Sequence, residues 1–195
     1  MKKFNLAQIV PALKSGGVEQ GTIDVANNIA NIEKRNFIIS NGGPLQTYLN
    51  KKYVQHYKLP VHTKNFLLMP FLGKKIQKLI ITNNINILHV RSRAPSWILP
   101  FINVSNLIKV STFHNVYNDQ NIIKKIYNKG LNNVDYIVAI SKYVEEEIIS
   151  KYKIDPNKIT VINRGIDIDF FCSKINEIEF IKFINSFKIS NNKKI

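Results

Sequence analysis

The sequence contains only one cysteine and shows no pattern typical of a metal site. Cys172 alone can form neither a disulfide within the chain nor a cysteine-cluster zinc site. The histidines are His56, His62, His89 and His114, and they show neither the H-E-x-x-H pattern nor a pair four residues apart. We therefore expect no bound metal and a reduced, cytoplasmic compartment.

Long apolar runs are also absent. The most apolar window covers residues 66–72, which is far short of the roughly 20 residues that a spanning helix needs. The apolar run at the N-terminus stops at Pro11 with no A-x-A cleavage site behind it, so it predicts a strand rather than a signal peptide. We expect a cytoplasmic protein, with peripheral attachment to the inner face of the cytoplasmic membrane as the alternative.

Acidic residues are scarce, with 13 Asp and Glu against 28 Lys and Arg, and the formal net charge is +15. The lysines are spread along the whole chain, without an arginine-rich block or the aromatic pattern of RNA-binding sheets. We therefore expect no nucleic-acid partner. Two interpretations stay open: a compositional bias toward Asn, Ile and Lys, or a basic face that contacts an anionic membrane surface.

Short apolar runs alternate with amphipathic stretches along the chain, whose hydrophobic content is 45%. The runs predict strands at 4–10, 37–40, 57–63, 85–90, 108–113, 136–140 and 160–163. Helices are expected at 18–29, 45–55, 71–82, 122–131, 144–149 and 175–187. This alternation predicts an α/β fold in which a doubly wound parallel sheet of about seven strands is covered by helices.

A tight turn joins the first predicted strand to the first helix. It contains Gly16 and Gly17, and a glycine turn at a helix N-terminus directs backbone N–H groups and the helix dipole toward an anion. Neither the G-x-G-x-x-G dinucleotide fingerprint nor the G-K-[ST] of a Walker loop is present. The two interpretations are an anion site and a sharp connection without a ligand.

Other polar or glycine residues follow the predicted strands. The carboxyl ends of parallel strands meet at one edge of the sheet, where ligands bind in such folds. Ser141 should also cap the helix that follows it, because a serine oxygen accepts the free N–H groups of a first turn. The residues expected at this edge are Gly16, Gly17, Gly42, Gly43, Arg91, Arg93, His114, Ser141, Arg164 and Gly165.

Five segments, in this order, resemble the amino-terminal half of family-4 glycosyltransferases. They are PALKSGGVE at 11–19, HVRSRAPSW at 89–97, TFH at 112–114, AIS at 139–141 and NRGID at 163–167. The family consists of retaining GT-B enzymes, among them bacterial lipopolysaccharide-core and phosphatidylinositol mannosyl transferases. The resemblance runs from Phe4 to Phe171. It implies a Rossmann-like domain at 1–167, with 168–195 as the hinge and the start of a carboxy-terminal donor-binding domain.

The resemblance also implies roles in a cleft between two domains. Gly16 and Gly17 would contact the donor's phosphates, with Glu19 nearby on the first helix. His114 would be the catalytic histidine that hydrogen-bonds the sugar or the acceptor near the reacting centre. The remaining cleft residues implied in this way are Arg91 and Arg93 on the acceptor side, Ser141, Arg164 and Gly165.

Each of these roles has a plainer alternative. His114 could be a structural histidine at a strand end, and Arg91 and Arg93 could be solvated surface residues. Glu19 could serve only to stabilise the helix N-terminus, where a negative charge is favourable. The sequence departs from the family pattern in two places, which weakens the assignment of these roles to this chain. The turn at 33–36 lacks the Gly-His pair that is common in the family. The basic pair and the E-x7-E motif that hold the donor have no counterpart in this sequence.

The expected function is therefore the acceptor side of a nucleotide-sugar-dependent glycosyltransferase. A UDP- or GDP-sugar would be its donor substrate, with no separate cofactor. The acceptor would be a lipid-linked molecule or a polysaccharide of the envelope, as in lipopolysaccharide synthesis. The chain looks truncated and inactive alone, unless a separate carboxy-terminal half completes it. The alternative is a non-catalytic remnant or acceptor-binding stub of a split or decayed gene.

Overall fold

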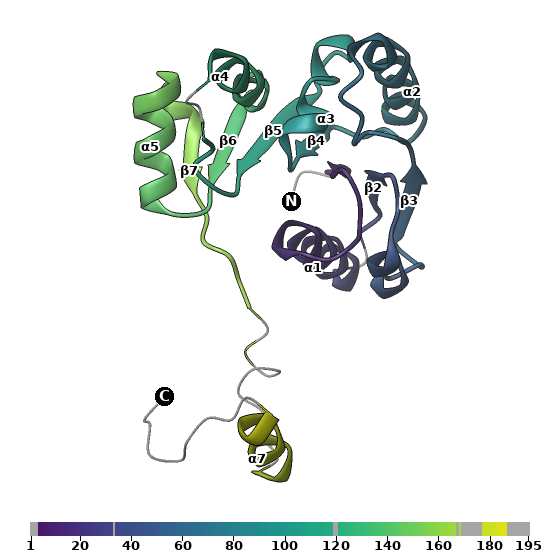
Figure 1. Cartoon of the computed structure of the whole chain (residues 1–195). Coiled ribbons are helices and arrows are strands. Elements are labelled where there is room, and N and C mark those ends of the chain that lie inside the picture. The colour runs from purple at the N-terminus through teal and green to yellow at the C-terminus, as the bar shows by residue number, and fades with distance from the viewer. Residues whose placement is uncertain (1–3, 33, 119–120, 167, 169–176, 187–195) are drawn as a thin grey trace. The chain divides into compact units, whose positions relative to one another are not determined.

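The computed structural model describes residues 4–32, 34–118, 121–166, 168 and 177–186 (Figure 1). The chain divides into two compact units, residues 1–163 and 164–195. The second unit contains the helix α7 (Glu177–Ser186), where Ile178 and Ile181 are exposed and Ile184 is buried. The expected domain border at residue 167 lies outside the described residues and stays a prediction.

The first unit is built on a sheet of seven parallel strands in the order β3-β2-β1-β4-β5-β6-β7. This confirms the predicted α/β class and the expected number of strands. The strands are β1 (Leu6–Ile9), β2 (Asn36–Ser40), β3 (Val54–Lys58), β4 (Ile87–Val90), β5 (Ile108–Phe113), β6 (Tyr136–Ala139) and β7 (Ile159–Val161).

Helices connect successive strands and cover the sheet (Figure 1). The α-helices of this unit are α1 (Gly17–Asn31), α2 (Met69–Thr82), α3 (Arg93–Ser96), α4 (Ile122–Asn128) and α5 (Lys142–Tyr152). Short 3₁₀ turns complete the connections: η1 (Pro44–Tyr48), η2 (Phe66–Leu68), η3 (Leu99–Phe101), η4 (Lys129–Asn132) and η5 (Pro156–Lys158).

The core has two parts, one on each side of the sheet. Ala7 and Ile9 of β1 belong to the larger cluster, together with side chains of α2 and α5. The residue between them, Gln8, faces α1 instead, where its amide nitrogen bonds the Thr22 carbonyl. Ile38 of β2 joins α1 in the smaller cluster. This alternation follows from the two-residue period of a strand. Because both faces of the sheet carry core residues, most strand positions are apolar.

The expected helix at 45–55 is wrong, and the strand expected at 57–63 starts earlier. Pro44 begins the single 3₁₀ turn η1, and β3 already starts at Val54. The parallel register Asn36↔Val54 to Ser40↔Lys58 explains the difference, because pairing with β2 outweighs local helix propensity. The other predicted strands overlap observed ones to within a few residues.

The strand order reverses between β1 and β4. From β1 the chain builds outward to β2 and β3, and it then crosses over to β4 on the other side. In doubly wound sheets the crevice beyond the carboxyl ends of the strands at such a reversal is where ligands bind. The glycine turn follows β1, and Arg91 follows β4 directly, so both lie at this point of the sheet.

Candidate active site at the carboxyl edge of the sheet

The turn after β1 delivers Gly16 as the N-cap residue of α1. Its φ of 138° lies in a region that favours glycine, and no side chain caps the helix there. A β-carbon at position 16 would lie only 2.8 Å from Oε2 of Glu19. The Glu19 carboxylate therefore sits over the glycine turn, at the positive end of the helix dipole where an anion is favoured.

The turn after β2 packs tightly against the turn after β1. Leu13 N–H donates to the Gly42 carbonyl at 2.9 Å, and Leu45 N–H donates to the Leu13 carbonyl at 2.9 Å. Gly43 has a φ of 151°, and a β-carbon there would lie 2.3 Å from the Leu13 carbonyl oxygen. Only glycine permits this approach of the two backbones, so the two turns form one unit at the edge of the sheet.

Arg91 is buried beside this unit, with 6% of its surface exposed. Its Nη1 donates to Oε1 of Gln8 at 2.9 Å, and Gln8 Nε2 donates to the Thr22 carbonyl of α1 at 3.1 Å. The alternative of a solvated surface residue is therefore wrong for Arg91. Its guanidinium belongs to a polar chain that connects β4, β1 and α1.

His89 lies in β4, two residues before Arg91, and is partly buried. Its Nε2 is 2.7 Å from the Thr112 hydroxyl of β5. Burial, together with the nearby Arg91 and His114, lowers the pKa of His89 to about 3. His89 is therefore a neutral imidazole at physiological pH, and it bridges β4 to β5 just inside the edge where His114 emerges.

His114 is half-buried and follows β5 directly. Its charge acts on the pKa of His89, which places the two imidazoles close together with Arg91. Burial raises the pKa of Tyr117, three residues further on, while the backbone of His114 acts in the opposite direction. The predicted catalytic histidine thus lies at the carboxyl edge, on a segment whose partly buried Tyr117 ring lies 6.0 Å from the Phe113 ring of β5.

Arg93 contacts the connection that follows β5, which contains His114 and Tyr117. Its guanidinium carbon lies 4.1 Å from the centre of the Tyr117 ring and 5.6 Å from that of Tyr127. Its Nη1 also donates to Oδ1 of the buried Asn128, at 2.8 Å. Such cation–π contacts are favourable. In this structure Arg93 therefore fixes the connection after β5 against α4.

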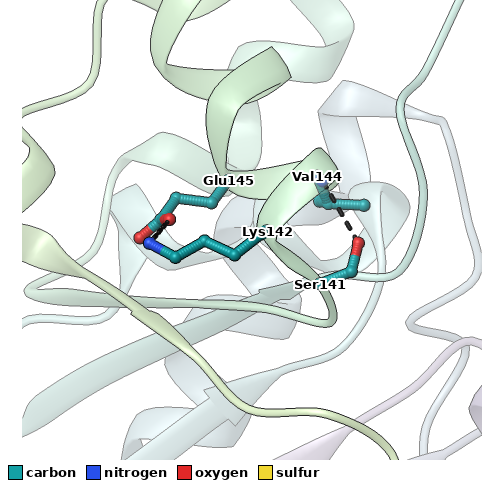
Figure 2. A network of polar contacts seen from close by, with 4 residues as sticks. All are labelled: Ser141, Lys142, Val144 and Glu145. Atoms are coloured by element: carbon teal, nitrogen blue, oxygen red, sulfur yellow. Dashed lines mark hydrogen bonds and ion pairs between the residues drawn. The ribbon is translucent and has the colours of Figure 1, made fainter.

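Ser141 caps α5 as predicted (Figure 2). Its hydroxyl accepts the N–H of Val144 at 3.2 Å, and an ion pair between Lys142 and Glu145 lies beside it. The cap places the N-terminus of α5 at the carboxyl end of β6. The hydroxyl of Ser141 is committed to this cap, and its contact with a ligand stays a prediction.

Arg164 and Gly165 belong to the second unit, and their place in the cleft stays a prediction. Both are exposed. Within the described residues, no three His, Cys, Asp or Glu side chains come close enough together to hold a metal ion. None of the helices in the described parts of the chain is long and apolar enough to cross a membrane.

The structure thus groups Gly16, Glu19, Arg91 and His114 around the switch point of the sheet. The sequence analysis missed Gln8, Thr112 and the role of His89 in this group. A signal for two of them was present, because Gln8 and His89 interrupt apolar runs that otherwise predict buried strands. A buried polar group needs a partner, so such interruptions indicate a polar network behind the site.

A comparison with models of protein families identifies the family of this chain. The model of Glycosyltransferase Family 4 matches residues 15–170, which is most of the chain. The chain belongs to glycosyltransferase family 4. A search of curated protein sequences finds no match.

Solved glycosyltransferase structures share the fold. A glycosyltransferase from Rickettsia africae is 34% identical, with a TM-score of 0.77 over 98% of this chain and 51% of its own. Anabaena HepE, solved with UDP and glucose, is 15% identical, with a TM-score of 0.71 over 97% of this chain and 52% of its own. WaaG, involved in lipopolysaccharide biosynthesis, is 11% identical, with a TM-score of 0.66 over 97% of this chain and 53% of its own. This family-4 chain spans about half the length of these structures.

Proposed function

We propose that this family-4 chain is the acceptor-side domain of a retaining, nucleotide-sugar-dependent glycosyltransferase. The observation that carries the proposal is that the glycine turn at Gly16 and the half-buried His114 both lie at the carboxyl edge of a sheet whose sequence matches family 4. A glycine turn at a helix N-terminus suits a diphosphate, and a half-buried imidazole at the same edge suits contact with a sugar hydroxyl or the acceptor.

The donor in this proposal is a UDP- or GDP-sugar, which is a substrate, and no further cofactor is invoked. Its support is the binding of UDP and glucose by HepE, which has the same fold. The acceptor is a lipid-linked molecule or a polysaccharide of the envelope, for which lipopolysaccharide synthesis by WaaG is the model. The proposed location is the cytoplasmic side of the membrane that carries this acceptor.

We further propose that residues 1–195 do not transfer sugar alone. The chain spans about half the length of the Rickettsia africae enzyme. Most of the charge stabilisation for a departing nucleoside diphosphate would have to come from groups that this sequence does not contain. A carboxy-terminal half, in the same or in a separate polypeptide, would therefore be required for turnover.

A transfer assay tests the proposal. The purified chain is incubated with radiolabelled UDP- and GDP-sugars and a membrane extract as acceptor, with and without a carboxy-terminal half of a family-4 enzyme. We expect transfer only in the combined sample. His114→Ala should lower kcat there by roughly 10²-fold or more, the range for the loss of one positioned hydrogen-bond donor at the reacting centre.

The matched control is His62→Ala, because His62 is exposed and follows β3 rather than β5. It should leave transfer unchanged in the combined sample. Turnover by the chain alone, lost in His114→Ala, would contradict the requirement for a second half. No transfer in any combination would favour the non-catalytic remnant instead.

A further inference from the structure

Three polar side chains gather over Gly42, in the turn that follows β2. A β-carbon at this glycine would meet all three: Oε1 of Gln46 at 3.6 Å, Cε of Lys58 at 3.8 Å and Cε1 of His56 at 3.9 Å. They come from two elements, because Gln46 belongs to η1, whereas His56 and Lys58 belong to the edge strand β3 (Figure 1). We call Gln46, His56 and Lys58 the Gly42 cluster.

A cavity of about 340 Å³ adjoins the Gly42 cluster. The side chains that line it are Gln46, Thr47, Leu49, Lys51, Val54 and His56. Leu49 and Val54 are buried members of the smaller core cluster, which also contains side chains of α1, and the rest of the wall is polar or basic. Ligand pockets range from about 300 to about 1,000 Å³, so this cavity suits one small molecule with both apolar and polar surface.

His56 is held through one ring nitrogen. Its Nε2 lies 2.8 Å from Oγ of Ser40, and this oxygen also accepts the N–H of Gly42 at 3.0 Å. Within the described part of the chain, no hydrogen bond or ion pair involves Nδ1 of His56, the side-chain amide of Gln46 or the ammonium of Lys58. Three groups that can donate hydrogen bonds thus remain available to a ligand at one place.

The charges around His56 are positive. Burial and the charge of Lys58 lower the pKa of His56, and Lys51 adds a second ammonium to the cavity wall. No aspartate or glutamate occurs in β2, η1, β3 or the turns between them. From α1, the neutral Asn27 bonds the last carbonyl of η1, and Asp24, one turn earlier, accepts a hydrogen bond within α1. The cavity therefore attracts an anion.

We propose that the Gly42 cluster and its cavity bind a monosaccharide that carries a carboxylate or a phosphate. Lys58 and the protonated His56 contact the anionic group, and charge-assisted hydrogen bonds of this kind are the strong ones. The Gln46 amide, which both donates and accepts, bonds the sugar hydroxyls. The apolar face of the sugar ring lies against Leu49 and Val54.

The Gly42 cluster is joined to the edge that carries the candidate active site. The Gly42 carbonyl accepts the N–H of Leu13 at 2.9 Å, so a sugar bound at the cluster would lie beside the turn that leads to Gly16. We therefore assign this sugar to the acceptor, as its anionic unit. That assignment rests on the proposed function, whereas binding of the sugar does not.

Binding should be linked to the protonation of His56. A bound anion offsets the charge of Lys58 and favours the imidazolium, so the pKa of His56 rises in the complex and the affinity grows as the pH falls. Glucuronate is the probe for this effect, because its carboxylate stays ionised above about pH 5. We expect its Kd to fall roughly threefold to tenfold from about pH 7.5 to about pH 5.5.

NMR titrations of the isotope-labelled full chain test the proposal without any sugar transfer. The Gly42 amide and the His56 ring report on the cluster directly. The probes are glucuronate, glucose 6-phosphate, glucose and inorganic phosphate. We expect glucuronate or glucose 6-phosphate to bind at least roughly tenfold more tightly than glucose or inorganic phosphate, and the tighter of the two identifies the anionic group.

Three variants separate the contributions of the cluster. His56→Gln keeps a side chain that can bond Ser40, and it should abolish the pH dependence of glucuronate binding. Lys58→Gln and Gln46→Ala change exposed side chains. Each should weaken binding several-fold, up to about tenfold, and leave thermal unfolding unchanged.

A second H-x-K segment provides the matched control. His62 and Lys64 have the same spacing as His56 and Lys58, but they are exposed and do not line the cavity. His62→Gln and Lys64→Gln should change the affinity for glucuronate less than about twofold.

Four results would overturn the proposal. They are the absence of shifts at Gly42 and His56 with both anionic sugars, equally tight binding of inorganic phosphate, an equal loss of affinity in the control variants, and a pH dependence that persists in His56→Gln. Glucuronate binding at the cluster without transfer in any combination would reject the proposed function and keep this site. Transfer in the combined sample without shifts at Gly42 would reject this site alone.

Discussion

Arg91 at the carboxyl end of β4 donates a hydrogen bond through Nη1 to Oε1 of Gln8 in β1, at 2.9 Å. These two strands flank the point where the sheet order reverses. The side-chain amide of Gln8 donates in turn to the Thr22 carbonyl. The Thr22 hydroxyl donates to the Val18 carbonyl in the first turn of α1. The first turns of α1 are thus linked through Gln8 to the buried guanidinium of Arg91, which follows the neighbouring strand β4.

Replacing Gln8 by alanine tests this connection. The substitution removes the acceptor of a buried guanidinium and the donor to Thr22. A hydrogen bond to a charged group contributes about 1.5–3 kcal/mol, so we expect the free energy of unfolding to fall by about that amount. Urea denaturation followed by circular dichroism measures it.

Gln20→Ala is the matched control for this change. Gln20 also donates a side-chain hydrogen bond, to Oδ1 of Asp24 at 2.8 Å, but the bond is exposed. We expect a change within about 0.5 kcal/mol, as for most surface substitutions. Equal effects of the two alanines would contradict a buried polar link between β1, β4 and α1.

The partly buried His89 predicts a specific pH dependence of stability. Its folded pKa of about 3 lies below the ordinary value of 6.5, so between these values the unfolded state binds a proton that the folded state does not. Stability is therefore lost as the pH falls from about 6.5 toward about 3, by about 1.4 kcal/mol per pH unit from this one group. Urea midpoints measured across this window should decline accordingly.

His89→Gln removes the titrating group and should flatten that part of the profile. The remaining slope then comes from His56, whose pKa is also lowered by burial, and from carboxylates, which titrate lower in the window. His62→Gln, at an exposed position, should run parallel to the wild type. A profile for His89→Gln that keeps the full slope would show that His89 does not stay neutral in the folded chain.

Gly43 is the glycine at which a side chain should be least tolerated. A β-carbon there would lie 2.3 Å from the Leu13 carbonyl oxygen, and φ is 151°. We expect Gly43→Ala to lower the free energy of unfolding by about 1–3 kcal/mol, the usual cost of a strained backbone position. Gly165→Ala, where no atom lies within 4 Å, should be close to neutral. Equal unfolding curves for the two variants would contradict the packing of the two turns.

The fold was largely predictable because periodicity is a property of the local sequence. Strand β5 was predicted with its observed bounds, Ile108–Phe113, since β-branched and aromatic residues are frequent there and the polar pair His114-Asn115 follows. The helix predicted at 45–55 was wrong because the end of this segment belongs to β3, which is defined by its pairing with β2. Local periodicity does not show which segment pairs with a distant strand.

The site was predictable in its position but not in its contacts. The carboxyl ends of parallel strands meet at one edge in any such sheet, so the positions of Gly16, Arg91 and His114 followed from topology. Whether the Arg91 side chain points to solvent or to Gln8 depends on the packing of two residues that lie 83 positions apart in the sequence. The sequence pattern alone left both possibilities open.

Glu19 leads to a prediction about ligand binding. Its carboxylate sits over the Gly16 turn, where it interacts favourably with the N-terminus of α1 and repels an incoming phosphate. Glu19→Gln should therefore tighten binding of UDP by about two- to fivefold and destabilise the fold by about 0.3–1 kcal/mol, the size of one charge at a helix end. Isothermal titration and urea denaturation measure the two effects. The control Asp24→Asn removes the same charge further along α1, and it should change UDP affinity less than twofold. Weaker UDP binding by Glu19→Gln would mean that the carboxylate supports the ligand instead of competing with it.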